Sequence, residues 1–283
     1  MAKVTGTFQI GDLQISQLSD GATFRDPKIL FDGVDELERT KALGLENISD
    51  LIPFNFSSFL VESPTSKWLV DTAYGHRDPE PDTESCAELL LRLSEKGVEP
   101  NDIDFVVHSH LHYDHVGWNL NKDDEITFPN ATHFVSESEF DWWINYAGND
   151  HPLKEKVQAK FKPLIDNNQV QTFVGDYKVN EYLTMIYAPG HTPGHCVQLI
   201  DSGNESLMIV GDAAHHPQHL VHQNWHPIFD WDRPQAFAAR KKIAAIAVEK
   251  NSIVTGVHWP VLTLAKLSEK NGSFQLEFID QNK

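Results

Sequence analysis

The chain is 283 residues long and carries 41 acidic against 23 basic side chains, which gives a formal net charge of −18. This excess of negative charge repels phosphate backbones, so we expect no nucleic acid partner. No apolar stretch reaches the ~18 residues of a membrane span, and the N-terminus lacks the apolar run of a signal peptide. Two cysteines, Cys86 and Cys196, are too few for a disulfide framework. We therefore expect a cytoplasmic protein, folded as a single domain over residues 1–283, that acts on a small molecule.

The first third of the chain is predicted to form mainly strands. Residues 8–18 alternate apolar and polar side chains around a Gly11-Asp12 turn, which is typical of two short strands. Residues 24–52 are irregular and charged, and we expect a surface excursion with one short helix. Two more strands follow, over residues 58–63 and 67–71, so that Asp71 lies where the second of them ends.

Helices and strands alternate in the remainder. Ser85 and Glu88 have capping-box spacing at the start of a helix over 85–96, and Gly97 is placed to end it. Ser136, with Glu139 three residues later, opens a second helix. A third begins after Pro152 and a fourth covers residues 233–249. Apolar strands are predicted at 103–107, 169–174, 183–188, 207–210 and 252–257.

The strand at 103–107 leads directly into a histidine-rich segment, His108-Ser-His110-Leu-His112-Tyr-Asp114-His115. Neutral imidazole and carboxylate are good ligands for zinc and similar divalent ions. His110 and His112 lie on the same side of an extended segment and can share one ion, whereas Asp114 and His115 follow a turn and suit a second. Burying this cluster without metal would be costly. The alternative is a solvated loop; the density of ligands favours a metal site.

The segment His110-x-His112-x-Asp114-His115 resembles the signature of the metallo-β-lactamase superfamily, and the family's other motifs follow in order. They are Lys67-Trp-Leu-Val-Asp71, Ala188-Pro-Gly-His191, Val210-Gly-Asp212 and Val257-His258. The resemblance implies an α/β fold, a four-layer αββα sandwich. It also implies two metal ions. Asp212 would bridge both ions, and the remaining ligands would divide between them: His110, His112 and His191 on one ion, and Asp114, His115 and His258 on the other.

Within the superfamily, the segments 128–131, 139–143 and 211–215 resemble the lactonase and methyl-parathion-hydrolase-like group. The resemblance implies zinc as the metal, with iron, manganese or cobalt as alternatives. It implies a metal-bridging hydroxide that cleaves a lactone or ester bond, with a phosphotriester as a further option. Asp114 would accept a proton and His215 would orient the substrate. Several acyl-homoserine lactonases carry a tyrosine at the position of His215.

Other functions are compatible with the same fold. A glyoxalase II-like thioesterase would need basic C-terminal residues to hold glutathione, and we see none. Iron-dependent oxidoreductases include flavodiiron proteins, which usually carry a glutamate at the position of His112 and an attached flavin domain. Persulfide dioxygenases use one iron, which does not explain Asp114, His115 and His258. A non-catalytic metal-binding scaffold would usually have lost ligands, and all seven are present.

Several further side chains have open roles. His108 is expected to be structural, and spacing alone does not decide between His191 and His195 as a ligand. Four histidines in the loop after Asp212 are expected at the surface or behind the ligands: His216, His219, His222 and His226.

Three aromatic side chains in that loop, Trp225, Phe229 and Trp231, are candidates for an aromatic wall along the substrate. The Trp142-Trp143 pair is expected to pack in the core or at an interface. A homodimer is a further option, with residues 24–52 or the Trp142-Trp143 helix as its contact.

Overall fold

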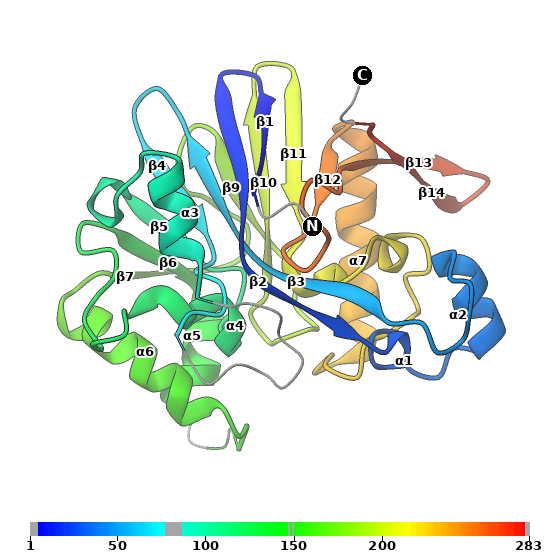
Figure 1. Ribbon diagram of the computed structural model, residues 1–283, viewed down its shortest axis with the longest axis horizontal. Coiled ribbons are helices and arrows are strands. Elements are labelled where there is room, and N and C mark those ends of the chain that lie inside the picture. Colours follow the sequence, from blue (N-terminus) through cyan, green and yellow to red (C-terminus); the bar gives the residue numbers. More distant parts are fainter. Residues whose placement is uncertain (1–4, 77–86, 147, 149, 281–283) are drawn as a thin grey trace.

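The computed structural model describes residues 5–76, 87–146, 148 and 150–280, and these contain two seven-stranded sheets (Figure 1). The first sheet has the order β1 (Thr5–Ile10), β2 (Leu13–Arg25), β3 (Ile52–Glu62), β4 (Lys67–Val70), β5 (Phe105–Val107), β6 (Thr132–Ser136) and β7 (Val170–Phe173). The second has the order β14 (Ser273–Phe278), β13 (Ala265–Lys270), β12 (Ile253–Thr255), β11 (Glu205–Ile209), β10 (Cys196–Ser202), β9 (Leu183–Tyr187) and β8 (Tyr177–Lys178).

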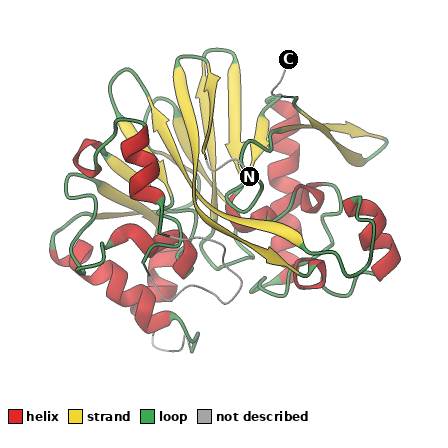
Figure 2. Cartoon of the chain, viewed as in Figure 1, coloured by secondary structure: helices red, strands yellow, loops and turns green. Residues whose placement is uncertain are grey.

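The two sheets bury one apolar layer between them, with Ile15 and Trp68 of the first sheet in the same cluster as Met185 and Leu207 of the second. Helices cover the outer faces. Helix α3 (Leu89–Glu95) packs on the first sheet and α7 (Arg233–Glu249) packs on the second. Figure 2 shows the strands in the middle and helices on both outer sides. The predicted αββα sandwich is confirmed.

The other helices are short. They are α1 (Pro27–Leu30), α2 (Glu36–Leu43), α4 (Tyr113–Val116), α5 (Glu137–Phe140), α6 (Lys154–Asp166), the 3-10 turns η1 (Pro100–Asp102), η2 (Gly117–Asn119), η4 (Gly211–Ala214) and η5 (Pro217–Leu220), and the π-helix η3 (Asp141–Asn145). None of the helices in the described ranges is long and apolar enough to cross a membrane.

Most predicted elements are present. Helix α7 spans the predicted residues because the Asp232 side chain caps it by accepting the Gln235 N–H. Helix α3 ends just before Gly97, which has the positive φ of 71° that favours glycine. Ser85 lies outside the described residues, but the predicted start of this helix was wrong: α3 begins at Leu89, because Ala87 has a positive φ of 64° that interrupts a helix, and Glu88 is its N-cap.

The prediction of an irregular surface segment with one short helix over residues 24–52 was wrong in part. Strand β2 continues to Arg25, and two helices follow instead of one, because Asp26 caps α1 and Asp35 caps α2 through their side chains. Strands β6, β8 and β10 and the hairpin β13–β14 were not predicted.

The strand order brings the metal-binding motifs together. Asp71, His110, His191, Asp212 and His258 follow β4, β5, β9, β11 and β12 respectively. Strands β4 and β5 are parallel, as are β11 and β12, so the carboxyl ends within each pair meet at one edge of the sandwich. Side chains placed at that edge can converge on one site.

Candidate metal centre

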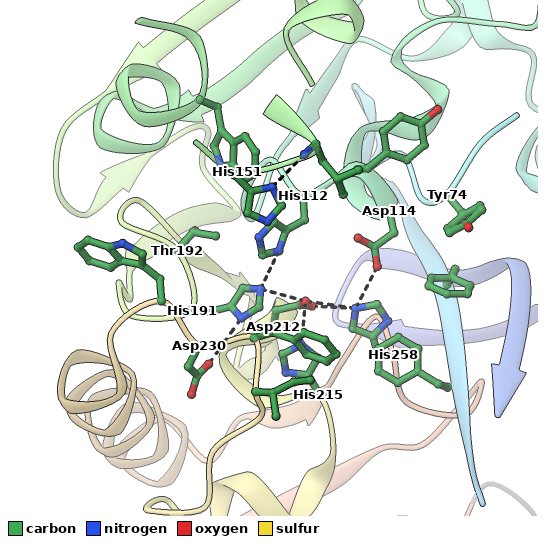
Figure 3. Close-up of a pocket in the computed structure, with 18 of the residues that line it drawn as sticks. Tyr74, His112, Asp114, His151, His191, Thr192, Asp212, His215, Asp230 and His258 are labelled. Atoms are coloured by element: carbon green, nitrogen blue, oxygen red, sulfur yellow. Dashed lines mark hydrogen bonds and ion pairs between the residues drawn. The ribbon is translucent and has the colours of Figure 1, made fainter. Parts of the chain in front are cut away.

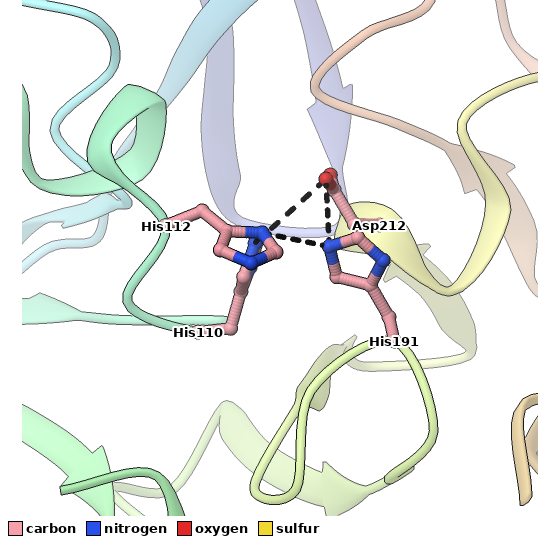
Figure 4. Close-up of side chains that lie close together, drawn as sticks. All are labelled: His110, His112, His191 and Asp212. Atoms are coloured by element: carbon pink, nitrogen blue, oxygen red, sulfur yellow. Dashed lines mark hydrogen bonds and ion pairs between the residues drawn. The ribbon is translucent and has the colours of Figure 1, made fainter. Parts of the chain in front are cut away.

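Three histidines and one carboxylate form the first ligand group (Figure 4). His112 Nδ1 lies 2.9 Å from both His110 Nε2 and His191 Nε2. The Oδ2 atom of Asp212 lies 3.3 Å from His191 Nε2 and 3.7 Å from His110 Nε2. All four atoms therefore point at one small volume.

A second group lies on the other side of Asp212. Its Oδ1 atom is 3.4 Å from His115 Nε2 and 3.0 Å from His258 Nε2. The Asp114 carboxylate closes the group, with Oδ2 at 3.7 Å from His258 Nε2 and 3.9 Å from His115 Nε2. Asp212 thus directs Oδ2 at the first group and Oδ1 at the second, and His258 Nε2 also lies 3.3 Å from Oδ2.

These distances fit metal binding. Nitrogen ligands at 2.0–2.1 Å from a tetrahedral zinc ion lie roughly 3.3–3.4 Å apart, and the two groups show 2.9 to 3.9 Å between their donor atoms. His115 Nε2 and Asp212 Oδ1 are buried, and apart from these close approaches within the group they have no hydrogen-bond partner, an arrangement that a cation would satisfy.

The charges around the ligands agree with this fit. Burial, followed by neighbouring histidines, lowers the pKa of His110 and of His112 well below its usual value, which keeps both imidazoles neutral. Burial also acts to lower the pKa of His115, but the carboxylates of Asp212, Asp71 and Asp114 outweigh it and raise that pKa well above its usual value. The cluster therefore carries an excess of negative charge that favours a bound cation.

The sequence profile of the metallo-beta-lactamase superfamily matches residues 52–255. This chain belongs to that superfamily. The matched range includes six of the seven predicted ligands, and the seventh, His258, lies three residues beyond its end.

Two individual proteins with similar sequences are N-acyl homoserine lactonases. N-acyl homoserine lactonase AttM of Rhizobium radiobacter is 36% identical over 142 residues, 48% of this chain and 49% of that protein. An N-acyl homoserine lactonase of a Bacillus species is 26% identical over 163 residues, 57% of this chain and 58% of that protein. The alignments therefore cover only about half of the length of these curated relatives.

Solved structures match along almost the whole chain. The dizinc quorum-quenching lactonase AidC, solved with a product bound, superposes with a TM-score of 0.82 at 27% identity, over 98% of this chain and 97% of that one. The hydrolase AbOPH superposes with a TM-score of 0.85 at 23% identity over 99% of both chains, which shows the shared fold.

Buried partners fix the orientation of the superfamily's ligands. His115 Nδ1 lies 2.9 Å from Asp71 Oδ2, and His258 Nδ1 lies 2.7 Å from the carbonyl oxygen of Asn55. Each contact assigns the proton to Nδ1 and leaves Nε2 free to ligate. Asp71, expected from its motif to lie near the ligands, also accepts hydrogen bonds from the N–H and the hydroxyl of Ser109.

Glu139 holds two ligand loops together. Its Oε1 accepts the N–H of Leu111, which lies between two ligand histidines, and the indole N–H of Trp143; its Oε2 accepts the N–H of Gly194. Ser136 caps α5 as predicted, but Glu139 does not complete a capping box. Burial raises the pKa of Glu139, and these hydrogen bonds act against that shift.

The site opens into a cavity of about 540 Å³ (Figure 3). Its aromatic lining includes Trp142, Trp143, Phe229 and Trp231, with the rings of Trp142 and Trp231 5.7 Å apart. Phe229 and Trp231 thus form part of the predicted aromatic wall. The prediction was wrong for Trp225, which is buried against Phe31.

The Trp142-Trp143 pair was expected away from the substrate, and this was also wrong in part. Trp143 is buried as predicted, with its indole bonded to Glu139, but both rings line the cavity.

The structure also places three further histidines. His195 Nε2 accepts the N–H of Asp212, so His195 supports that loop and His191 is the one in the first ligand group. His108 is buried against His133, consistent with its expected structural role. His219 bonds to the carbonyl oxygen of Leu30.

His215 is the predicted substrate-orienting residue, and it lies within the centre. Its Nε2 is 3.1 Å from Asp212 Oδ2, and its ring stacks 5.5 Å from the ring of His258. With Asp212 and His258 it forms a third group of atoms close enough to hold an ion.

Several site residues were missed from the sequence: Arg25, Phe54 and His151 line the cavity, and Asp230 and Arg240 lie at its edge or behind it. The side chains of Asp230 and Arg240 are fully buried and 2.6 Å apart. One signal was available: Arg240 falls on the buried stripe of α7, three residues before Ile243 and one after Ala239. A charged residue on a core-facing stripe indicates a buried ionic partner.

Proposed function

We propose that the chain is a dinuclear, metal-dependent hydrolase that cleaves lactone or ester bonds, with zinc as its metal. The observation that carries the proposal is the placement of Asp212, which presents Oδ2 to one ligand group and Oδ1 to the other. His110, His112 and His191 would hold the first ion, and Asp114, His115 and His258 the second. The likeness to the dizinc lactonase AidC over nearly the whole chain supports this assignment.

Two bound zinc ions would supply Lewis acidity, which polarises a scissile carbonyl and makes a water molecule nucleophilic near neutral pH. The protein supplies orientation and proton transfer. Asp114 lines the cavity and its side chain is 25% exposed, so its carboxylate can accept a proton from a reacting group. His215 lines the same cavity and can direct an imidazole N–H at a substrate oxygen.

The cavity lining favours a substrate with an apolar portion. Trp142, Trp231 and Phe229 offer aromatic surface on one wall. On another, Phe54 stacks 4.0 Å from the His258 ring, and the Arg25 guanidinium lies 5.7 Å from the Phe54 ring centre. Arg25 is the only lysine or arginine that lines the cavity among the described residues. The proposed substrate class is therefore alkyl lactones and aryl esters.

A substrate panel tests the proposal. Zinc-loaded protein is assayed against alkyl lactones, including N-acyl homoserine lactones, and against aryl esters, thioesters and phosphotriesters. We expect the highest kcat/KM for a lactone or an oxygen ester, and loss of turnover when zinc is removed. A clear preference for thioesters, or full activity in the metal-free protein, would contradict the proposal.

A further inference from the structure

A buried carboxylate stands behind one of the proposed ligands. His191 directs Nε2 toward the metal site, and its other ring nitrogen, Nδ1, lies 3.5 Å from Asp230 Oδ1 (Figure 3). Both of these atoms are buried and have no other hydrogen-bond partner. Two unpaired polar atoms that face each other in the protein interior form a hydrogen bond when the ring nitrogen carries the proton.

The other oxygen of Asp230 is held by Arg240. Oδ2 accepts from Arg240 Nη2 at 2.6 Å, and His226 Nδ1 lies 3.0 Å from both Oδ2 and Arg240 Nη1. The ion pair with Arg240, whose two side chains are fully buried, holds the Asp230 carboxylate in a fixed orientation.

Arg240 extends the network from α7 to the rest of the centre. Its Nε donates to the carbonyl oxygen of Ala213, the residue next to Asp212, at 2.8 Å, and its Nη1 donates to the carbonyl oxygen of Trp225 at 3.0 Å. One guanidinium thus fixes the backbone beside the bridging carboxylate and the carboxylate behind His191. Asp230 also lies in sequence between two residues of the cavity wall, Phe229 and Trp231.

We propose that Asp230 is a positioning residue for the first metal ion: anchored by Arg240, it accepts the Nδ1 proton of His191 and so directs Nε2 of that ring at the ion. The inference rests on the proposed function, because it takes His191 as a ligand. A carboxylate in this place fixes both the tautomer and the angle of the ring and makes the imidazole a stronger donor. Asp230 would accordingly affect one of the two ions much more than the other.

Asp230→Asn is the direct test. The amide can offer oxygen to His191 or to Arg240, but not to both, because its NH₂ group must face one of these donors. Metal-free protein is titrated with zinc in competition with a chromophoric chelator, and both dissociation constants are measured. We expect one site to weaken by roughly 10–100-fold, the usual effect of losing such a partner, while the other changes only a few fold.

The matched control is Arg233→Met. It removes an ion pair from the same segment, Arg233–Asp32, whose side chains are 2.6 Å apart but 45% exposed and touch no ligand. We expect wild-type affinity at both zinc sites in this variant. A folded Asp230→Asn protein with two wild-type affinities would overturn the inference, as would equal weakening of both sites, which indicates a general structural role.

A second measurement needs no variant. In zinc-loaded wild-type protein with ¹⁵N-labelled histidine, NMR reports which ring nitrogen of His191 carries a proton and how fast that proton exchanges. We expect a proton on Nδ1 that is protected from exchange. A proton that exchanges as fast as one on an exposed histidine would overturn the inference. Failure of the proposed function itself looks different, because the wild-type protein would then bind fewer than two ions.

Discussion

Replacing Glu139 by glutamine should weaken both the fold and the metal centre. The carboxylate is fully buried and accepts three hydrogen bonds, from Leu111 N at 2.9 Å, Trp143 Nε1 at 2.7 Å and Gly194 N at 2.9 Å. Glutamine keeps the shape but has one acceptor oxygen. Its NH₂ group must therefore face either Gly194 N or the pair formed by Leu111 and Trp143.

The magnitude follows from these contacts. In the better orientation the Gly194 N–H is left buried without an acceptor, which costs about 1–3 kcal/mol. The two remaining hydrogen bonds become weaker because their acceptor no longer carries a charge. The buried charge itself is also removed, and the free energy that its desolvation cost offsets part of that loss. We therefore expect the unfolding free energy of the metal-free protein to fall by about 2–4 kcal/mol, which for a protein of this size lowers the Tm by roughly 3–7 °C.

The assay is thermal and urea unfolding of metal-free protein, followed by circular dichroism. Glu137→Gln is the control, because Glu137 lies in the same helix but is exposed. Zinc affinity should also fall, since Leu111 lies between His110 and His112. A Glu139→Gln protein within about 0.5 kcal/mol of wild type, the range of ordinary surface substitutions, would refute the reasoning.

Three further predictions concern activity and stability. Asp212→Ala should lower turnover far more than His215→Ala, because only Asp212 contacts both ligand groups. His215→Ala should lower turnover on the order of 10²-fold or less. Equal, total inactivation by both changes would mean that His215 is itself a ligand. Burial lowers the pKa of His133 to about 3 in the folded protein. Between pH 3 and 6.5 the unfolded chain therefore binds one more proton than the folded chain. The stability that His133 contributes is accordingly present above pH 6.5 and lost as the pH falls. His133→Asn should thus remove about 1.4 kcal/mol of the destabilisation seen on acidification to pH 5.5, and an unchanged pH dependence would contradict this. Finally, neutral lactones and esters should have a higher kcat/KM than carboxylated analogues; if the anionic analogue is preferred at both low and high salt, Arg25→Met will show whether Arg25 is the cause.

The seven candidate ligands could be named from the sequence because their motifs are local, and the structure brings their side chains together. His110, His112, Asp114 and His115 lie within one short segment, and each remaining ligand follows an apolar strand. Such strands can be recognised from their residues alone, and α/β folds bring their carboxyl ends together. Helix α7 was equally clear, since its cap and its apolar stripe are encoded within the helix.

The supporting residues could not be predicted in the same way. Asp230 acquires its role only when a loop brings it against His191 and Arg240, which depends on tertiary contacts. Trp225 and Trp231 look alike in the sequence, but one packs into the core and the other lines the cavity. The hairpin β13–β14 is a different case: Asn271-Gly272 is a strong turn signal, and both residues have positive φ, so it was available and overlooked.

The central claim is that two metal ions share Asp212, and zinc titration of the metal-free protein tests it most directly. We predict two zinc ions per wild-type chain, and weakened binding of both ions in Asp212→Ala, because each ligand group uses one oxygen of that side chain. A wild-type protein that binds a single ion, or an Asp212→Ala protein that binds both with unchanged affinity, would contradict the claim.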